Sequence, residues 1–142
     1  MNLKTFLSVL LVYRSNFHVL HWMVKGSKFF MLHDKATEYA EELLKDADIV
    51  AELILRTEDS IVNYSEALKL IEESDYKFLV LESDRLFETE EFVKISDKMF
   101  ADILYCISEI LDSSDDISVK SSLETMYNKY DLQCNYLLKR LD

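Results

Sequence analysis

Apolar residues recur every three or four positions along most of the chain, which is the spacing that buries one side of an α-helix. The pattern predicts two long helices near the start of the chain, over residues 3–24 and 29–56, and a short helix over residues 64–73. A third long helix is predicted over residues 83–111, and a fourth follows the polar turn at residues 112–116. The chain is therefore expected to be all-α.

The lengths of the connections predict how these helices are arranged. Short links join the first long helix to the second and the third to the fourth, whereas one long link joins the second to the third. This plan predicts a four-helix bundle with one long crossover carrying a short helix, as in ferritin-like folds, in one domain spanning residues 1–142. Gly26 is expected to cap the end of the first helix, and Asp115 or Asp116 the start of the last.

The second and the last predicted helix each carry a series of small, aliphatic or aromatic residues. On the second helix, small and aliphatic residues form one tight stripe that is expected to be buried: Ala36, Ala40, Leu43, Ala47, Val50 and Ile54. The last helix carries Leu123, Met126, Tyr127, Tyr130, Cys134 and Leu137 towards the C-terminus.

Composition supports the helical prediction and limits the function classes. The 142 residues include no Pro and one Gly, and the net charge is −11. Such an acidic chain, with no basic tail before the first helix, is not expected to bind DNA directly, although it can attract cations. Cys106 and Cys134 lie in separate helices among apolar neighbours, which indicates reduced core residues of a cytoplasmic protein.

The N-terminal segment faintly resembles a secretory signal. Lys4 is followed by an apolar run over residues 6–13, but no small-residue cleavage site follows and the run continues a helical seam. No apolar run approaches the roughly 18 residues that a transmembrane helix needs. We therefore expect a soluble protein without a signal peptide.

Four polar residues raise a geometric problem. His21 and His33 are twelve residues apart, and Asp48 and Glu52 follow fifteen and nineteen residues after His33 on the same predicted helix. Fifteen helical residues span roughly 22 Å, so His33 and Asp48 of one chain cannot bind the same metal ion. If the four residues form one site, that site must be shared by two chains.

The second helix carries a face on which two chains could meet. If angles around the helix axis are measured from the middle of the core stripe, His33 lies at about 60°, Asp48 at about 120° and Glu52 at about 160°. The same sector carries apolar or small residues that the core does not need: Phe30, Thr37, Leu44, Ala51 and Leu55. A second copy packed antiparallel would bury these residues and bring His33 towards the partner's Asp48 and Glu52, with His21 reaching the same place. A two-fold axis would then create two identical sites.

The ligand types indicate iron more than structural zinc. Two imidazoles and two carboxylates suit Fe(II) when coordination positions stay open for oxygen or peroxide, whereas structural zinc more often recruits thiolates. No Glu-x-x-His occurs in the chain, so a di-iron site at the bundle centre is not expected.

Each of these residues also has an ordinary structural interpretation. His21 could be a packed core histidine, and His33 a polar residue near a helix start. Asp48 and Glu52, four apart, could mark a solvated helix face. His18 is interpreted as structural or as supporting a ligand, and Trp22 as an interface or core aromatic. The joint spacing on an otherwise apolar face favours the site.

Residues 16–56 resemble the Dps family of mini-ferritins, the DNA-binding proteins from starved cells. The resemblance rests on the segment HWMVKG at residues 21–26, the phenylalanine-rich segment FFMLH at residues 29–33, and the ending DIVAE at residues 48–52. It implies a dodecameric hollow shell that oxidises Fe(II), preferably with hydrogen peroxide, and stores ferric mineral.

The resemblance also implies residue roles. His21 and His33 of one chain and Asp48 and Glu52 of its neighbour would hold the metal across a dimer interface. The two carboxylates would hold the higher-affinity iron, and the histidines would complete the site or act through water. Trp22, beside the site, would quench radical intermediates.

Several positions depart from the family pattern. Met23 replaces a usual asparagine, and Leu53 replaces a usual basic residue, which removes a possible interfacial ion pair. Residues 57–59 replace a glycine-rich helix exit, and the basic tails that bind DNA in some members are not seen. Asp112, Asp115 and Asp116 could line an acidic pore or form a solvated turn with a helix cap.

Three functions therefore remain open. The first is a mini-ferritin ferroxidase that protects against iron and peroxide. The second is a structural or interaction oligomer of the same fold, for example virus-encoded, without ferroxidase activity. The third is a plain helical bundle with a binding role, in which the histidines are core residues.

Overall fold

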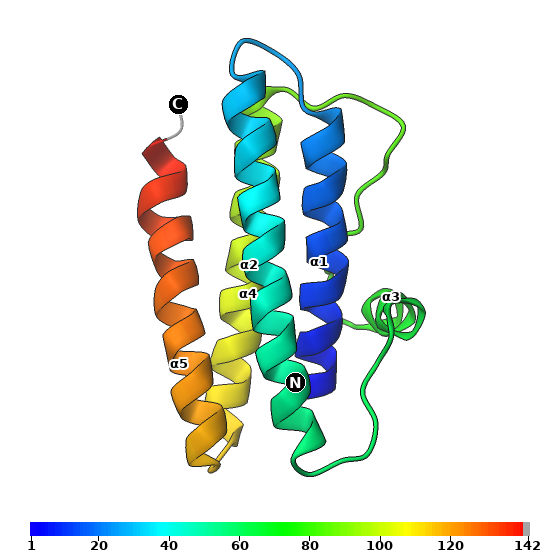
Figure 1. The fold of residues 1–142 in the computed structure, drawn as a ribbon, viewed down its shortest axis with the longest axis vertical. Helices are drawn as coiled ribbons and strands as arrows, with labels where there is room; N and C mark the ends of the chain where they lie inside the picture. The colour runs from blue at the N-terminus through cyan, green and yellow to red at the C-terminus, as the bar shows by residue number, and fades with distance from the viewer. Residues whose placement is uncertain (141–142) are drawn as a thin grey trace.

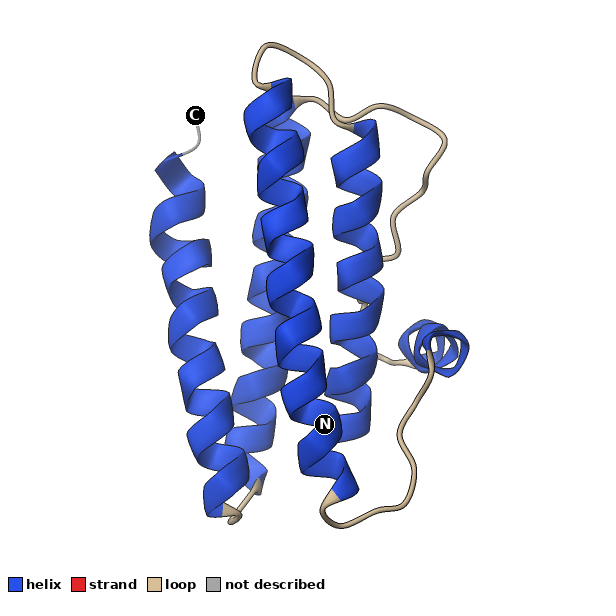
Figure 2. Cartoon of the chain, in the orientation of Figure 1, coloured by secondary structure: helices blue, strands red, loops and turns tan. Residues whose placement is uncertain are grey.

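Four long helices stand side by side in the computed structural model, which describes residues 1–140 (Figure 1). They are α1 (Leu3–Met23), α2 (Phe29–Leu55), α4 (Thr89–Ser113) and α5 (Ile117–Leu132). The short helix α3 (Tyr64–Glu73) lies across the outside of α1, within the long crossover (Figure 2). Helices α1 and α5 run up and α2 and α4 run down, which confirms the predicted ferritin-like arrangement.

Local capping signals explain where three of the helices begin. The side chain of Asn2 accepts a hydrogen bond from the Thr5 amide at 2.8 Å at the start of α1. Asn63 forms a capping box with Glu66 at the start of α3. Asp116 accepts from the Val119 amide at 3.1 Å, so the predicted cap of the last helix is confirmed.

Two predicted helix ends are wrong. The backbone leaves the first helix at Val24, which is extended, so Gly26 is not its cap and instead lies in the turn to α2 with φ 112°. The third long helix begins at Thr89 rather than at residue 83. Residues 83–88 form a bend followed by an isolated bridge at Phe87, whose amide donates to Met23 O at 2.8 Å and whose carbonyl oxygen accepts from the Lys25 amide at 2.9 Å.

The core stripe predicted for α2 is confirmed. All six of its residues are buried in the hydrophobic core. Phe17 of α1, Tyr39 of α2 and Phe100 of α4 are in mutual ring contact, with centroids 5.0 to 5.5 Å apart. Cys106 and Cys134 are buried and unpaired, as predicted.

The last helix changes its geometry near the C-terminus. Residues Gln133–Leu137 form a π-helical turn, which takes more residues per turn than an α-helix. The buried position after Cys134 is therefore Leu138, at 1% exposed, whereas Leu137 is 38% exposed.

Within residues 1–140, no helix has the length and apolar character that crossing a membrane requires.

Candidate metal centre

The end of α1 and the start of α2 bring the two candidate histidines together. The turn between these helices is short, and the Phe29 amide donates to Gly26 O at 3.1 Å. The imidazoles of His21 and His33 stack, with ring centroids 3.6 Å apart and planes 20° apart. The sequence placed both residues at one site, and the structure places them in direct contact.

Backbone contacts fix the orientation of both rings. Nδ1 of His21 lies 2.8 Å from the carbonyl oxygen of His33, and Nδ1 of His33 lies 2.7 Å from the carbonyl oxygen of His21. A carbonyl oxygen can only accept, so each Nδ1 must carry the proton. A neutral ring of this tautomer keeps the Nε2 lone pair for a metal ion. The Thr37 hydroxyl lies 2.7 Å from His21 Nδ1 and completes the cluster.

Aromatic rings surround the histidine pair. Phe29 stacks on His33 at 5.1 Å, and the Trp22 ring lies 6.5 Å from His21. Trp22 is 67% exposed, so its interpretation as a core aromatic is wrong, while an interface role stays a prediction. His18 is half-buried, with its ring 5.7 Å from that of Trp22, and burial lowers its pKa, with a contribution from the nearby positive charge of Arg14.

The two candidate carboxylates lie elsewhere in the same chain. Asp48 and Glu52 are exposed on the lower half of α2. Their separation from His33 along the helix axis is about 22 Å or more at about 1.5 Å per residue. In the described part of a single chain, no group of three His, Cys, Asp or Glu side chains could hold a metal ion. The structure therefore unites the histidines and keeps the carboxylates apart from them.

The apolar sector of α2 lies outside the core, as predicted. Phe30 is 81% exposed, Leu55 is 50% exposed and Leu44 is 38% exposed, whereas Thr37 and Ala51 are half-buried. These side chains share the outer surface of α2 with Asp48 and Glu52. A single chain leaves this surface uncovered.

Two buried carboxylates were missed by the sequence analysis. Asp102 accepts from the hydroxyls of Tyr13 and Tyr76, each at 2.5 Å, and from Lys98 Nζ at 2.7 Å. Burial, together with the hydrogen bond to Asp102, raises the pKa of both tyrosines. This carboxylate is saturated by protein donors, so it belongs to the structure of the core.

The second buried carboxylate joins α2 to α5. Asp46 accepts from Lys129 Nζ at 2.6 Å and from the Tyr130 hydroxyl. Lys129 also donates to Glu42 at 3.0 Å, and that hydrogen bond lowers the pKa of Glu42. The lysine and tyrosine lie more than 80 residues away along the chain, so no local signal could reveal the pairing.

Comparisons with known proteins agree with the fold. The profile of the ferritin-like domain family matches residues 2–118. The chain belongs to the ferritin-like family. A search of curated protein sequences gives no match.

Solved ferritin-like structures include several similar to this chain. Antigen TpF1 of Treponema pallidum superposes with a TM-score of 0.83 at 18% identity, over 96% of this chain and 85% of that one. Dps from Staphylococcus aureus gives 0.80 at 26% identity, over 96% and 89%. Dps92 of Deinococcus radiodurans gives 0.78 at 17% identity, over 94% and 81%. The two Dps structures and the ferritin-like match support the predicted membership of the Dps family.

Proposed function

We propose that this protein is a Dps-type mini-ferritin. It oxidises Fe(II) at sites shared by two chains and stores ferric iron inside a hollow homo-oligomer, expected to be a dodecamer built from two-fold dimers. The iron is its substrate, and its role is to limit damage by iron and peroxide. The observation that carries the proposal is the stacked histidine pair, whose Nδ1 atoms are both committed to carbonyl oxygens while an uncovered apolar surface lies beside it.

The proposed site combines His21 and His33 of one chain with the partner's Asp48 and the partner's Glu52. Nε2 of the imidazoles would supply neutral nitrogen ligands, and the carboxylates would balance the charge of Fe(II). Because Nδ1 is held by the backbone, the rings need no reorientation when iron binds. The net charge of −11 would raise the local concentration of Fe(II) around the protein.

Hydrogen peroxide is the oxidant in the reaction that this site would support. Two Fe(II) ions each lose one electron, and one hydrogen peroxide accepts both electrons and two protons from solvent to give two waters. The protein residues hold the metal ions and neutralise their charge. Trp22, exposed beside His21, would lose an electron and its indole proton to any oxidising radical that escapes.

Ferric iron formation tests the proposal directly. The protein is loaded with Fe(II) without oxygen, hydrogen peroxide is added, and the growth of ferric absorbance is followed. We expect fast growth in the wild-type protein and at least about a tenfold slower rate in His33→Ala and in Asp48→Ala, because each loses a ligand. Asp84→Ala is the matched control for Asp48→Ala, since it removes the same carboxylate from an exposed position in the crossover, away from the proposed site.

Light scattering separates the remaining alternatives. A large oligomer that shows no ferric growth beyond the protein-free control would contradict the enzymatic proposal and favour a structural or interaction oligomer. A monomer at micromolar concentration would contradict the shared site itself.

A further inference from the structure

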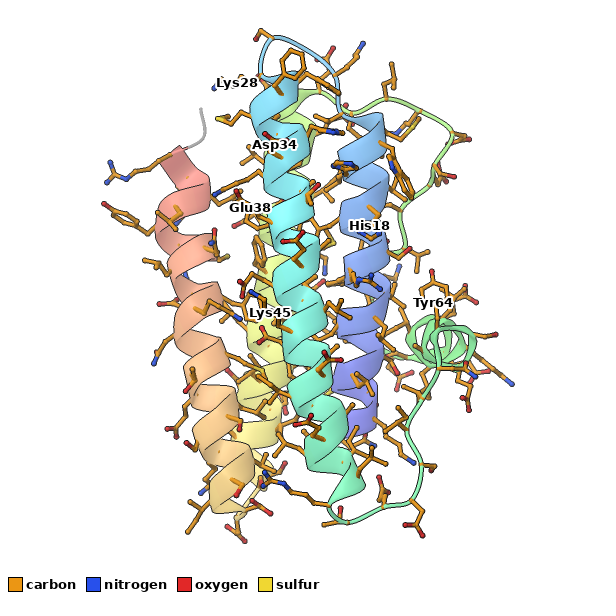
Figure 3. The ribbon with its side chains drawn as sticks, viewed as in Figure 1. His18, Lys28, Asp34, Glu38, Lys45 and Tyr64 are labelled. Carbon is orange, nitrogen blue, oxygen red and sulfur yellow. The ribbon has the colours of Figure 1, made fainter. Side chains whose placement is uncertain are left out.

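Charged side chains line the outer surface of α2 in a regular arrangement. Figure 3 shows Asp34, Glu38 and Lys45 following one another down this helix. Glu38 and Lys45 are strongly exposed, with 62% and 71% of their side-chain surfaces accessible. They are seven residues apart, so they project from the same side of the helix, about 20° apart around its axis.

This surface is strongly acidic. It carries five exposed carboxylates, two of which are the candidate ligands Asp48 and Glu52: Asp34, Glu38, Glu41, Asp48 and Glu52. Helix α2 contains two lysines. Lys35 lies 3.1 Å from Glu38 and above the Tyr39 ring at 5.8 Å, at the flank of the helix. Lys45 lies nearer the centre, with Glu42 at 3.5 Å.

Two copies meeting through this surface would bring like charges together. An antiparallel pair doubles the number of carboxylates in the contact, and carboxylates brought close together repel one another. A cation near the middle of the surface would relieve the repulsion, and Lys45 is in that position.

The proposed metal site fixes which residues face each other. His33 must lie level with the midpoint between the partner's Asp48 and the partner's Glu52. In an antiparallel two-fold pair, moving towards the C-terminus of one helix moves the facing position by the same number of residues towards the N-terminus of the other. Lys45 comes as many residues after His33 as Glu38 comes before that midpoint, so Lys45 lies level with the partner's Glu38. The two-fold axis also places these residues on the same side of the contact, because both project from the same side of α2.

We propose that Lys45 of one chain forms an ion pair with the partner's Glu38, twice per two-fold contact, and that this pair selects the register of the two α2 helices. The inference rests on the proposed shared iron site, which supplies the register. A slip of two helical turns in either direction would set Lys45 against the partner's Lys45, or Glu38 against the partner's Glu38. The charges therefore oppose the wrong registers as well as favouring the right one.

Charge reversal tests the pair. Dimer dissociation is followed by mass photometry on dilution, and by exchange of fluorescently labelled subunits if no dissociation is seen at the lowest concentration. Lys45→Glu and Glu38→Lys are each expected to raise the dissociation constant or the exchange rate about tenfold in low salt, because an exposed attraction becomes a repulsion at two symmetric places. The double variant with both substitutions is expected to recover most of the loss, and high salt should reduce all the differences.

Lys94→Glu on α4 provides the control for net charge, since it makes the same change outside this surface. The proposal is overturned if Lys45→Glu behaves as Lys94→Glu does, or if the double variant is no better than the sum of the single variants. In either case, fast ferric growth in Lys45→Glu would leave the proposed function standing. Loss of ferric growth in the wild-type protein would instead contradict the function, whatever the assembly does.

Discussion

Mixing two inactive variants provides the sharpest test of a site shared between chains. A dimer of His33→Ala chains lacks an imidazole at both sites, and a dimer of Asp48→Ala chains lacks a carboxylate at both. In a mixed dimer, one site carries both defects, while the other combines an intact His33 with an intact Asp48. If equal amounts assemble at random, about half of the dimers are mixed, so about a quarter of the sites are intact.

Co-expression of the two variants, followed by the peroxide assay, measures this recovery. The expected rate per subunit is about a quarter of the wild-type rate, against about a tenth or less for either variant alone. This gain requires the separation seen in the structure, because a site within one chain would be damaged in every subunit of the mixture.

A second mixture controls for any gain in rate that comes only from assembling two different variants together. His21→Ala and His33→Ala affect the same side of the proposed site, so no mixed dimer has an intact one, and their mixture should stay at the level of its parents. If the first mixture also stays at that level while light scattering shows mixed oligomers, the shared site is refuted.

The remaining predictions concern stability. Asp102→Asn replaces a buried carboxylate, which accepts from Tyr13, Tyr76 and Lys98, with a neutral amide. The free energy of unfolding is expected to fall by about 3 kcal/mol and Tm, measured by thermal unfolding, by about 10 °C. A decrease in Tm of less than about 2 °C would contradict this account. Burial raises the pKa of Tyr39 to about 12. The buried, protonated hydroxyl therefore stabilises the folded state fully below about pH 10, the pKa of an unfolded tyrosine, and this stabilisation of about 2–3 kcal/mol is lost as pH rises towards 12. Urea unfolding between pH 9 and 12 should show a shallower decline in Tyr39→Phe, and an unchanged decline would be evidence against the assignment. Gly26→Ala is expected to cost about 1 kcal/mol, because φ is 112° while the added Cβ would meet only Thr89 Oγ1 at 4.0 Å; a loss above about 3 kcal/mol would indicate a clash instead.

The sequence predicts elements well where their signals are local. The short helix over residues 64–73 and the end of α2 agree with the structure, because caps, breakers and apolar periodicity lie within the segments themselves. The start of α4 could not be found in this way. Residues 83–88 have no strong helix breaker, and Phe87 is instead hydrogen-bonded to the backbone at the end of α1, a tertiary contact that the local sequence does not reveal.

The candidate site shows the same division. The spacing of His21 and His33 predicts that they share a location, but their stacking depends on the path of the turn at Gly26 and on two carbonyl oxygens. The surface carrying Asp48 was predicted from periodicity alone, since exposure on a helix follows its angle. The burial of Asp46 and Asp102 could not be predicted, because the tyrosines that donate to both carboxylates, and Lys129 beside Asp46, are brought near by the tertiary fold.

The short parallel bridge between Val24 and Phe87 has a consequence for evolution as well as for folding. It fastens the last residues of the long connection to the backbone just beyond His21. Insertions or deletions earlier in the crossover can be absorbed without reaching the histidine pair, whereas a change in length between residues 85 and 89 would pull directly on it. Related chains are therefore expected to vary in length before this bridge and to keep a constant length after it.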